Sequence, residues 1–430
     1  MKKFRVLIIG SGGREHAIAW SIFKNKDVEK IFCCPGNGGT HDTFTNVEID
    51  VRNHDHVVSF IEHNLIDLTV VGPEDPLADG IVDSLKSKGL IVFGPSQYCS
   101  QLESSKLFAR NLMKEVGIPH PKFFECSNRQ EILNAKKILG LPLVLKADGL
   151  AAGKGVIICS SDKEIDDAID LMLNQKAFGS ASSKISVEEC LMGEEVSVFA
   201  ICNDKNYQIL NTAQDHKRAY DGDLGPNTGG MGAYSPTLLV DDMMMHEVQK
   251  DIIEPTLHAL SERNNPYCGF LYCGLMIVDG KPYVIEYNVR MGDPEAQVVI
   301  PLLKESIFDI LWCCANNKEL PSVTREENKT AVSVVISSDG YPGSYDKGKI
   351  IKGLNESNDN LIFHSGTVKK NDEIYTNGGR VLNVVGFGED LKSAIDDAYM
   401  AIKQIDFSNK FFRKDIGLKG LNYQRVKDDK

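Results

Sequence analysis

The sequence predicts an α/β protein of several domains that begins with a parallel, doubly wound sheet. Over the first hundred residues, short apolar runs alternate with helical patterns, and each apolar run ends in a glycine-containing loop. Buried strands are expected at 5–9, 31–34, 68–71 and 90–93, and helices at 14–25, 54–63 and 79–88. Such a βαβα rhythm is typical of a parallel sheet that binds its ligand at the carboxyl ends of the strands.

Length and composition agree with this organisation. The chain has 430 residues, enough for roughly two to four domains of ordinary size. Hydrophobic residues make up 42% and charged residues 25%, as in typical globular proteins. A polar stretch at 316–329 precedes a new set of strands, so we expect domains at 1–100, 101–327 and 328–430.

Charge and cysteine usage exclude several classes of protein. The formal net charge is −12, which argues against a general nucleic-acid binder, because phosphate backbones require dense Lys and Arg. No apolar run approaches the ~20 residues of a membrane span, and the run at 6–9 is too short for a signal peptide. The eleven cysteines form no CxxC pair and are expected to be free thiols. We therefore expect a cytoplasmic protein without nucleic-acid or membrane partners.

The first glycine loop, which includes Gly12 and Gly13, lies between a predicted strand and a predicted helix. Backbone N–H groups at a helix N-terminus can bind a phosphate. A dinucleotide-binding fingerprint needs glycine or alanine where Glu15 stands, and an acidic residue where the second strand ends in Cys33-Cys34-Pro35. A nicotinamide cofactor is therefore disfavoured, and a phosphate site or a plain tight turn remains.

The second glycine loop lies at 149–155 and differs from a Walker motif. A Walker motif has four residues between its glycines and Ser or Thr after its lysine. Here three residues separate Gly149 from Gly153, and Gly155 follows Lys154. Since β-branched residues come next, we expect a hairpin flap over nucleotide phosphates, with Lys146 supplying charge. A surface hairpin without a ligand is the alternative.

The segment 283–295 carries an alternating pattern on a predicted strand. Glu286, Asn288 and Arg290 are expected to share one face, while the apolar residues between them, Ile285 included, share the other. Carboxylate and amide oxygens suit a divalent metal that is shared with phosphates, and arginine can clamp an oxyanion. The alternative is a solvated strand face with an ion pair.

Two further segments are rich in polar residues. The segment 214–232 is long for a plain connector, and its His216 is either a catalytic or metal-binding residue or an ordinary hydrogen-bonded loop histidine. The segment 188–195 ends a predicted strand, so its backbone can read an adenine edge and Glu195 can accept from ribose hydroxyls. A plain acidic turn is the other interpretation of that segment.

Together these motifs resemble the phosphoribosylamine–glycine ligases of the ATP-grasp superfamily. The resemblance covers nearly the whole chain and rests on ordered segments at 10–17, 35–40, 72–80, 146–156, 214–218, 225–236 and 286–297. It implies a Rossmann-like N-terminal domain, a central ATP-grasp unit with a mobile lid at about 120–190, and a small C-terminal α+β domain. It also implies a carbon–nitrogen ligase of purine biosynthesis, which joins glycine to 5-phospho-β-D-ribosylamine through glycyl phosphate and releases ADP and phosphate.

The resemblance further implies roles for matching residues. ATP is expected to contact Lys106, Lys146, Gly149, Gly153, Lys154, Gly155, Glu188, Leu191 and Glu195. The metal, Mg²⁺ or Mn²⁺, is expected on Glu286 and Asn288. Glycine and the ribosylamine are expected near Gly12, Gly13, Asn37, Gly38, Glu74, Asp75, Asp215, Arg290 and Asp293. Arg290, Asp215 and Lys146 are the expected catalytic residues.

The sequence leaves several alternatives open. The strand at 274–278 lacks the acidic residue that many ATP-grasp enzymes carry there, so either two protein ligands suffice for the metal or Asp293 helps. A formate- or bicarbonate-using relative is disfavoured by the segments 214–218 and 225–236. A catalytically silent nucleotide-binding regulator is disfavoured because Glu286, Asn288 and Arg290 are all present. Because the chain ends at residue 430, we expect a monofunctional enzyme. We expect it to be a monomer or a weak homo-oligomer.

Overall fold

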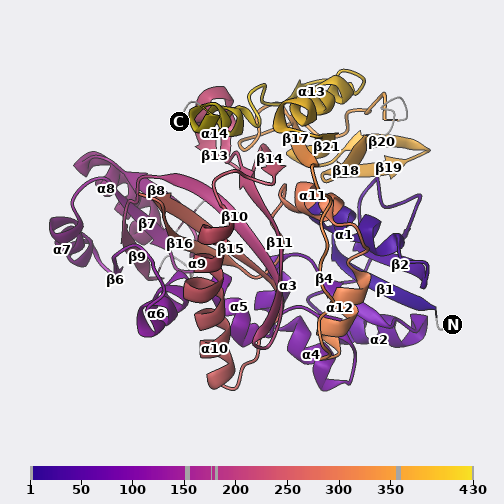
Figure 1. Cartoon of the computed structure of the whole chain (residues 1–430), viewed down its shortest axis with the longest axis horizontal. Helices are drawn as coiled ribbons and strands as arrows, with labels where there is room; N and C mark the ends of the chain where they lie inside the picture. The colour runs from indigo at the N-terminus through magenta and orange to yellow at the C-terminus, as the bar shows by residue number, and fades with distance from the viewer. Residues whose placement is uncertain (1–2, 151–154, 176, 180–182, 355–359, 429–430) are drawn as a thin grey trace.

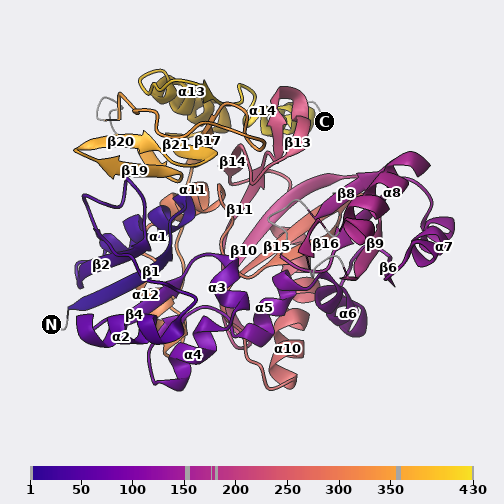
Figure 2. The ribbon, with the colours of Figure 1, turned by 180° about the vertical axis from the view of Figure 1, so that it is seen from behind.

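The computed structural model describes residues 3–150, 155–175, 177–179, 183–354 and 360–428. Figures 1 and 2 show the N-terminal sheet and its helices on one side of the molecule and a smaller sheet with α7 and α8 on the other. A long twisted sheet lies between them and continues into the C-terminal layer. Within the described residues, no helix is both long and apolar enough to cross a bilayer.

The N-terminal domain is the predicted doubly wound parallel sheet. Its strand order is β3-β2-β1-β4-β5, and every neighbouring pair is parallel. The strands are β1 (Phe4–Gly10), β2 (Val28–Pro35), β3 (Thr45–Asn46), β4 (Leu68–Val71) and β5 (Val92–Phe93). The helices are α1 (Gly13–Phe23), α2 (His54–Asn64), α3 (Glu74–Ala78) and α4 (Ile81–Ser87). The helix expected at 79–88 instead begins at Ile81, because Gly80 adopts a left-handed conformation between α3 and α4.

The polar and apolar pattern of the sequence predicts one helix at 103–117, but a break at Ser105 separates α5 (Gln97–Ser104) from α6 (Lys106–Val116). Ser105 is extended, and its hydroxyl caps α6 by accepting the Phe108 N–H at 3.1 Å. The break places Glu103 at the end of one helix and Lys106 at the start of the next. Both residues thereby reach the site described below.

The lid is a small antiparallel sheet with its own core of buried aliphatic residues. Its strand order is β6-β9-β7-β8, formed by β6 (Phe123–Cys126), β7 (Leu143–Ala147), β8 (Val156–Cys159) and β9 (Ile185–Glu189). Its helices are α7 (Arg129–Leu139), α8 (Asp162–Ile169) and the π-helical turn η1 (Asp170–Asn174). Lys146 pairs with Val156 across β7 and β8, so the strands on either side of the second glycine loop form a hairpin, as predicted.

The central sheet runs without interruption into the C-terminal domain. Its strand order is β16-β15-β10-β11-β14-β17-β21-β18, with β22 (Lys410–Phe411) paired to β17. The strands are β10 (Glu194–Asn203), β11 (Asn206–Asp215), β14 (Gly232–Ser235), β15 (Cys268–Val278), β16 (Lys281–Asn288), β17 (Thr330–Ser338), β18 (Leu361–His364) and β21 (Arg380–Gly388). Because Tyr234 of β14 pairs with Val332 of β17, one sheet spans the expected boundary at 328.

The remaining elements cover this sheet or project from it. The helices are α9 (Asp242–Val248), η4 (Gln249–Ile253), α10 (Glu254–Glu262), α11 (Ala296–Val299), η5 (Ile300–Leu302), α12 (Phe308–Ala315), α13 (Leu391–Ile402) and α14 (Leu418–Asp428). Small hairpins are formed by β12 (Arg218–Tyr220) and β13 (Leu224–Asn227), joined by η3 (Asp221–Asp223), and by β19 (Thr367–Lys370) and β20 (Glu373–Thr376). The eleven cysteines, all in the described part of the chain, are free thiols as predicted.

A buried arginine fastens the β12–β13 hairpin to the C-terminal domain. The Arg413 side chain is only 1% exposed, and its guanidinium contacts Asp223 at 3.0 Å and Asp415 at 2.8 Å. It also donates to the Arg218 carbonyl at 3.0 Å. Burial raises the pKa of Asp415, but the hydrogen bond from Arg413, the Gly222 N–H and the charge of Arg413 together outweigh this and hold that pKa at about 2.

We predict that Arg413→Met destabilises the protein by about 2–3 kcal/mol, because it removes the buried guanidinium from two partly buried carboxylates, of which Asp223 keeps a contact with Lys419. Since the carboxyl pKa is lowered on folding, this contribution is complete above the ordinary carboxyl pKa and is lost as pH falls through the folded value. In thermal melting, the stability difference between wild type and Arg413→Met should be constant between pH 7 and 5 and should become smaller below about pH 4.

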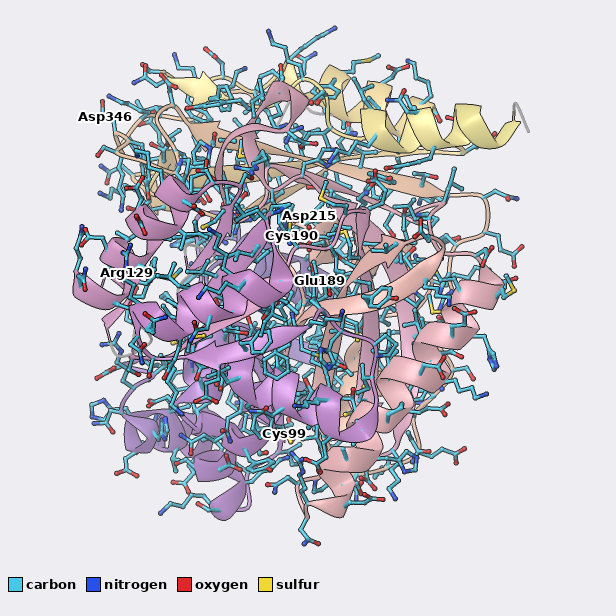
Figure 3. The ribbon with its side chains drawn as sticks, turned by 90° about the vertical axis from the view of Figure 1, so that its left-hand side faces the viewer. Cys99, Arg129, Glu189, Cys190, Asp215 and Asp346 are labelled. Atoms are coloured by element: carbon cyan, nitrogen blue, oxygen red, sulfur yellow. The ribbon has the colours of Figure 1, made fainter. Side chains whose placement is uncertain are left out.

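Arg129→Met is the matched control, because Arg129 (labelled in Figure 3) forms a solvent-exposed ion pair with Asp166. That variant should cost less than about 1 kcal/mol. Equal deficits for the two variants would show that Arg413 is not a structural link.

Candidate functional site

The predicted carboxylate strand brings its three polar residues together at the end of β16. Asn288 Nδ2 lies 3.5 Å from Glu286 Oε1, and Arg290 Nη2 donates to Asn288 Oδ1 at 3.1 Å. The alternation of the strand therefore places a carboxylate, an amide and a guanidinium on one face, as the sequence predicts.

A β-bulge at Ile285 changes the other face of the strand. Gly274 of β15 pairs with Glu286, but the next residue, Leu275, pairs with Val284. Val284 and Tyr287 therefore both enter the core, and the expectation that Ile285 belongs to that apolar face is wrong. The extra residue exposes a carbonyl oxygen that strict pairing would have occupied.

That carbonyl anchors two buried cations. The Ile285 oxygen accepts from Lys146 Nζ at 2.8 Å and from Arg110 Nη2 at 2.6 Å. Glu188 completes the group, since its carboxylate lies 3.0 Å from Lys146 Nζ and 2.7 Å from Arg110 Nη2. The Glu188 side chain is only 1% exposed, so its carboxylate is not free for a ribose and only its backbone can contact a nucleotide.

Glu286 is surrounded by positive charge. Burial raises its pKa, but Lys217, Lys146, Lys106 and Arg290 outweigh that effect and hold the pKa at about 2. A Cβ atom at Gly274 would lie 2.8 Å from Glu286 Cγ, so the absence of a side chain on the neighbouring strand makes room for this carboxylate. Glu286 is thus an ionised carboxylate with space reserved for its side chain.

The residues present fit a divalent metal that is shared with phosphates. Within the described ranges, no group of three or more His, Cys, Asp or Glu side chains is arranged to hold a metal. Glu286 and Asn288 supply two hard oxygen donors, which is the usual protein share of a site that nucleotide phosphates complete. Asp293 bonds instead to the Arg14 N–H, Gln297 and Arg380, so it is not a third ligand.

Lys217 is a charged residue of this site that the sequence analysis did not single out. Its ammonium contacts Glu195 and lies 3.6 Å from Glu286. Burial lowers the pKa of Lys217, but the surrounding carboxylates raise it well above its ordinary value. Glu195 is therefore paired with a lysine through one carboxylate oxygen, and its contact with a ribose stays a prediction. In the sequence, Lys217 lies in the polar segment 214–218, but nothing there distinguishes it from its charged neighbours.

Asp215 lies beside the same charges. Burial raises the pKa of Asp215 well above its ordinary value, and Glu295, Glu195 and Glu286 raise it further against the effect of Lys217. Figure 3 labels Asp215 together with Glu189, the last residue of β9, and Cys190, which follows it, and in this view they lie over the same central part of the molecule. An additional cationic group beside Asp215 would relieve this repulsion.

The base of the flap is fastened to the start of α6. Lys106 Nζ donates to the Gly149 carbonyl at 2.9 Å, and Asp148 accepts from the Ser105 hydroxyl at 2.9 Å. The Gly155 carbonyl accepts the Ala147 N–H at 2.9 Å and closes the hairpin. Two predicted nucleotide contacts, Gly153 and Lys154, lie outside the described residues, and Leu191 is half-buried in the turn after β9.

The first glycine loop differs from the expected phosphate cradle. The Gly12 N–H donates to Glu15 Oε2 at 2.7 Å, the Gly13 N–H to Ser365 Oγ at 3.0 Å and the Arg14 N–H to Asp293 Oδ2 at 3.3 Å. The first N–H groups of α1 are therefore taken by protein acceptors, and the predicted backbone phosphate site at Gly12 and Gly13 is not available in this structure. Glu15, which breaks the dinucleotide fingerprint, is the residue that folds back onto the loop.

The loop after β2 is also committed to the C-terminal domain. The Asn37 side chain donates to the His364 carbonyl at 2.7 Å and accepts the Gly39 N–H at 2.9 Å. The Gly38 N–H donates to Thr367 Oγ1 at 3.1 Å. The N-terminal residues expected to bind substrate thus face Ser365 and Thr367, which the sequence analysis missed, and Asn383 donates to Ser365. Arg380, also missed, instead contacts the Gly229 carbonyl and Asp293. In the sequence, the pair of glycines before Arg380 is the only signal for a functional loop in this part of the C-terminal domain.

Arg290 joins the end of β16 to the N-terminal domain. Its Nε lies 3.2 Å from Glu74 Oε2 at the start of α3, and its Nη2 lies 2.7 Å from Glu103 Oε1 at the end of α5. Burial raises the pKa of Glu74, but the charges of Arg290 and Arg14 outweigh it and hold the pKa at about 2. Asp75, the neighbouring predicted residue, is exposed.

His216 behaves as a buried structural residue. It is only 1% exposed, its Nε2 accepts the Gly417 N–H at 3.3 Å, and burial lowers its pKa to about 4. The structure therefore favours the hydrogen-bonded interpretation over the catalytic one.

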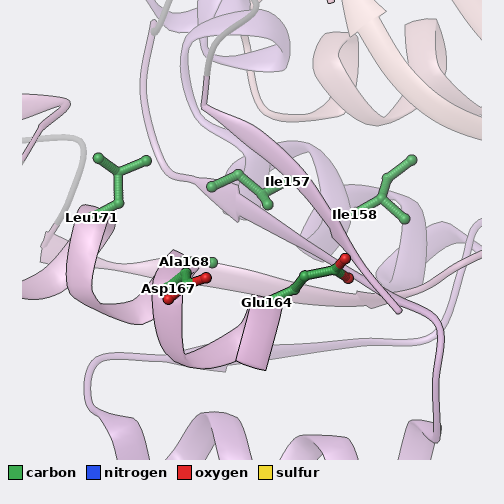
Figure 4. Close-up of a pocket in the computed structure, with 6 residues that line it drawn as sticks. All are labelled: Ile157, Ile158, Glu164, Asp167, Ala168 and Leu171. Carbon is green, nitrogen blue, oxygen red and sulfur yellow. The ribbon is translucent and has the colours of Figure 1, made fainter. Parts of the chain in front are cut away.

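A separate hollow of about 300 Å³ lies on the lid between β8 and α8, lined by Ile157, Ile158, Glu164, Asp167, Ala168 and Leu171 (Figure 4). None of these residues belongs to the predicted site.

Comparison with known proteins covers almost the entire chain. Residues 4–103 match the phosphoribosylglycinamide synthetase N domain, residues 104–296 its ATP-grasp (A) domain and residues 331–419 its C domain. A phosphoribosylamine–glycine ligase from Halalkalibacterium halodurans is 43% identical over 422 residues, covering 98% of each chain. One from Vibrio cholerae is 42% identical over 428 residues, covering 98% of this chain and all of its own.

Solved structures agree with these matches. The crystal structure of phosphoribosylamine–glycine ligase from Thermotoga maritima has a TM-score of 0.86 and 35% identity, covering 96% of this chain and 100% of its own. A biotin carboxylase domain from Hydrogenobacter thermophilus shares the fold alone, with a TM-score of 0.72 and 15% identity over 96% of this chain and 92% of its own. The chain belongs to the phosphoribosylglycinamide synthetase family, whose members are named phosphoribosylamine–glycine ligases.

Proposed function

We propose that this protein is a cytoplasmic ligase that joins glycine to 5-phospho-β-D-ribosylamine, with ATP cleaved to ADP and phosphate, in purine biosynthesis. The observation that carries the proposal is the charge arrangement at the end of β16. Glu286 and Asn288 offer oxygen donors there, while Lys146, Lys217 and Arg290 offer positive charge within the same site. Phosphoryl transfer requires such positioning and charge stabilisation.

In the first step a glycine carboxylate oxygen attacks the γ-phosphorus of ATP, forming glycyl phosphate and releasing ADP. Lys146 is held against Glu188 and Ile285, so its ammonium is oriented at the base of the flap. Arg290 presents its guanidinium beside the metal donors, where it can steady the transferring phosphate. A divalent metal on Glu286 and Asn288, Mg²⁺ or Mn²⁺, neutralises phosphate charge when bound.

In the second step the ribosylamine nitrogen attacks the acyl carbon, and phosphate leaves with the former carboxylate oxygen. The acyl phosphate must be kept from water, and the β7–β8 hairpin fastened by Lys106 is the element suited to cover it. Asp215 is the residue we assign to the glycine ammonium, because burial and three neighbouring carboxylates raise its pKa, and a bound ammonium group would offset both effects.

The ribosylamine site is assigned to the junction of the N-terminal loops with the C-terminal domain. Glu74 faces this junction from α3 and pairs with Arg290 at 3.2 Å, which connects the two substrate sites. Asp293 is already paired with Arg380 at 3.3 Å, so it shapes the loop and is a weaker choice for the ammonium group. Binding of the 5-phosphate at Gly12 and Gly13 requires that the Gly12 N–H leaves Glu15 and the Gly13 N–H leaves Ser365, the acceptors they have in this structure.

The proposal predicts a specific substrate requirement. The purified protein should release ADP in a coupled assay only when glycine and phosphoribosylamine are both present, and mass spectrometry should find glycinamide ribonucleotide in equal amount. Formate or bicarbonate in place of glycine should give background rates. ADP release that depends on either of these instead of glycine would assign the chain to a different ligation.

We predict that Glu286→Gln lowers kcat by at least ~100-fold, because several kcal/mol of charge stabilisation depend on the ionised ligand. The variant should keep the wild-type circular dichroism spectrum, and its affinity for Mn²⁺ in the presence of ADP, measured by electron paramagnetic resonance, should fall. Glu262→Gln, an exposed residue of α10, is the control and should match wild type in both measurements. Near-normal turnover of Glu286→Gln at saturating metal would remove Glu286 from the metal site.

A further inference from the structure

The guanidinium of Arg290 contacts two carboxylates of different exposure among the described residues. Glu103 of α5 lies 2.7 Å from Nη2, and its side chain is 7% exposed. Glu74 of α3 lies 3.2 Å from Nε, and its side chain is 30% exposed. A substrate can therefore compete with Glu74 for Arg290, whereas the Glu103 contact is shielded from solvent.

Glu103 also holds the backbone beside Arg290. Its Oε2 accepts the Val289 N–H at 2.8 Å, and Val289 lies between the metal donor Asn288 and Arg290. One carboxylate thus fixes both the main chain and the side chain at the end of β16. An arginine with its five donors and several rotatable bonds needs such a partner to point in one direction.

The origin of this contact lies in the break at Ser105. Because α5 ends at Ser104, Glu103 is in the last turn of the helix and points to β16, while Lys106 of the next helix points to the flap. A continuous helix over 103–117 would not separate the two directions in this way. The helix break therefore aims one charged residue at each half of the nucleotide site.

We propose that Glu103 is the positioning residue of the ligation: it orients Arg290 and the end of β16 toward the transferring phosphate, and Glu74 is the partner that substrate displaces. This inference rests on the proposed function. Glu103 itself is too deeply buried to touch a substrate, so it acts through Arg290.

The test is a double-mutant cycle between Glu103→Gln and Arg290→Met. Glu103→Gln keeps an acceptor for the Val289 N–H but loses the charge that faces Arg290. We expect it to lower kcat about 10–100-fold, as is usual for residues that orient a reacting group, while the KM for ATP stays close to wild type. In the Arg290→Met background, Glu103→Gln should have no further effect on kcat, because its target is gone.

The control is Asp397→Asn. Like Glu103, Asp397 accepts one backbone N–H, from Phe387 at 2.8 Å, and one side-chain N–H, from Asn360 at 2.7 Å, but it lies on α13 away from the site. Its kcat should match wild type. Should Glu103→Gln fail to fold, Glu103→Asp, which keeps the charge on a shorter stem, enters the same cycle with the same expected non-additivity.

The possible results distinguish failure of the proposed function from failure of this inference. If wild type shows no glycine-dependent ADP release, the proposed function is wrong. If wild type is active and Glu103→Gln has wild-type kcat, or if the losses of the two variants multiply in the double variant, Glu103 does not act through Arg290 and the inference is overturned. A raised KM for ATP with unchanged kcat would likewise contradict it, since that pattern reports nucleotide binding alone.

Discussion

Opposite charges buried against the end of β16 are the interaction on which the rest of this structure depends. Lys146 and Arg110 meet Glu188 and the Ile285 carbonyl on one side of the strand, and Arg290 meets Glu103 and Glu74 at its end. These partners come from the lid, α6, α5 and α3, so a single strand end joins the lid, the central sheet and the N-terminal domain. Removing one partner of such a buried pair typically costs about 3–5 kcal/mol, which strongly selects a single arrangement.

The β-bulge at Ile285 explains how one strand can serve both structure and chemistry. It lets Val284 and Tyr287 enter the core while Glu286 and Asn288 face the site, and it frees a carbonyl for Lys146. Gly274 leaves the space into which the Glu286 side chain extends. The net acidity of −12 is no obstacle to phosphorylated substrates, because the cations that matter are placed individually among buried carboxylates.

The parts of the site that are local in sequence could be predicted, and those that depend on long-range contacts could not. Strand alternation predicts that Glu286, Asn288 and Arg290 lie together, and the βαβα rhythm predicts the parallel sheet. The bulge leaves no mark in composition, so the orientation of Ile285 was predicted wrongly. Glu103, Lys217 and Ser365 act through residues far away along the chain, and only the folded structure shows their partners. The departure at Glu15 was visible in the sequence, but its hydrogen bond to the Gly12 N–H was not.

The central claim is that the charges around Glu286, Lys146 and Arg290 promote transfer of the γ-phosphoryl group to the glycine carboxylate. It is tested most directly by running the complete reaction with glycine labelled with ¹⁸O in both carboxylate oxygens and analysing the released phosphate by mass spectrometry. An acyl phosphate intermediate transfers one glycine oxygen to each phosphate, so the account predicts one ¹⁸O atom per phosphate formed with product. Unlabelled phosphate, released while glycinamide ribonucleotide accumulates, would contradict it.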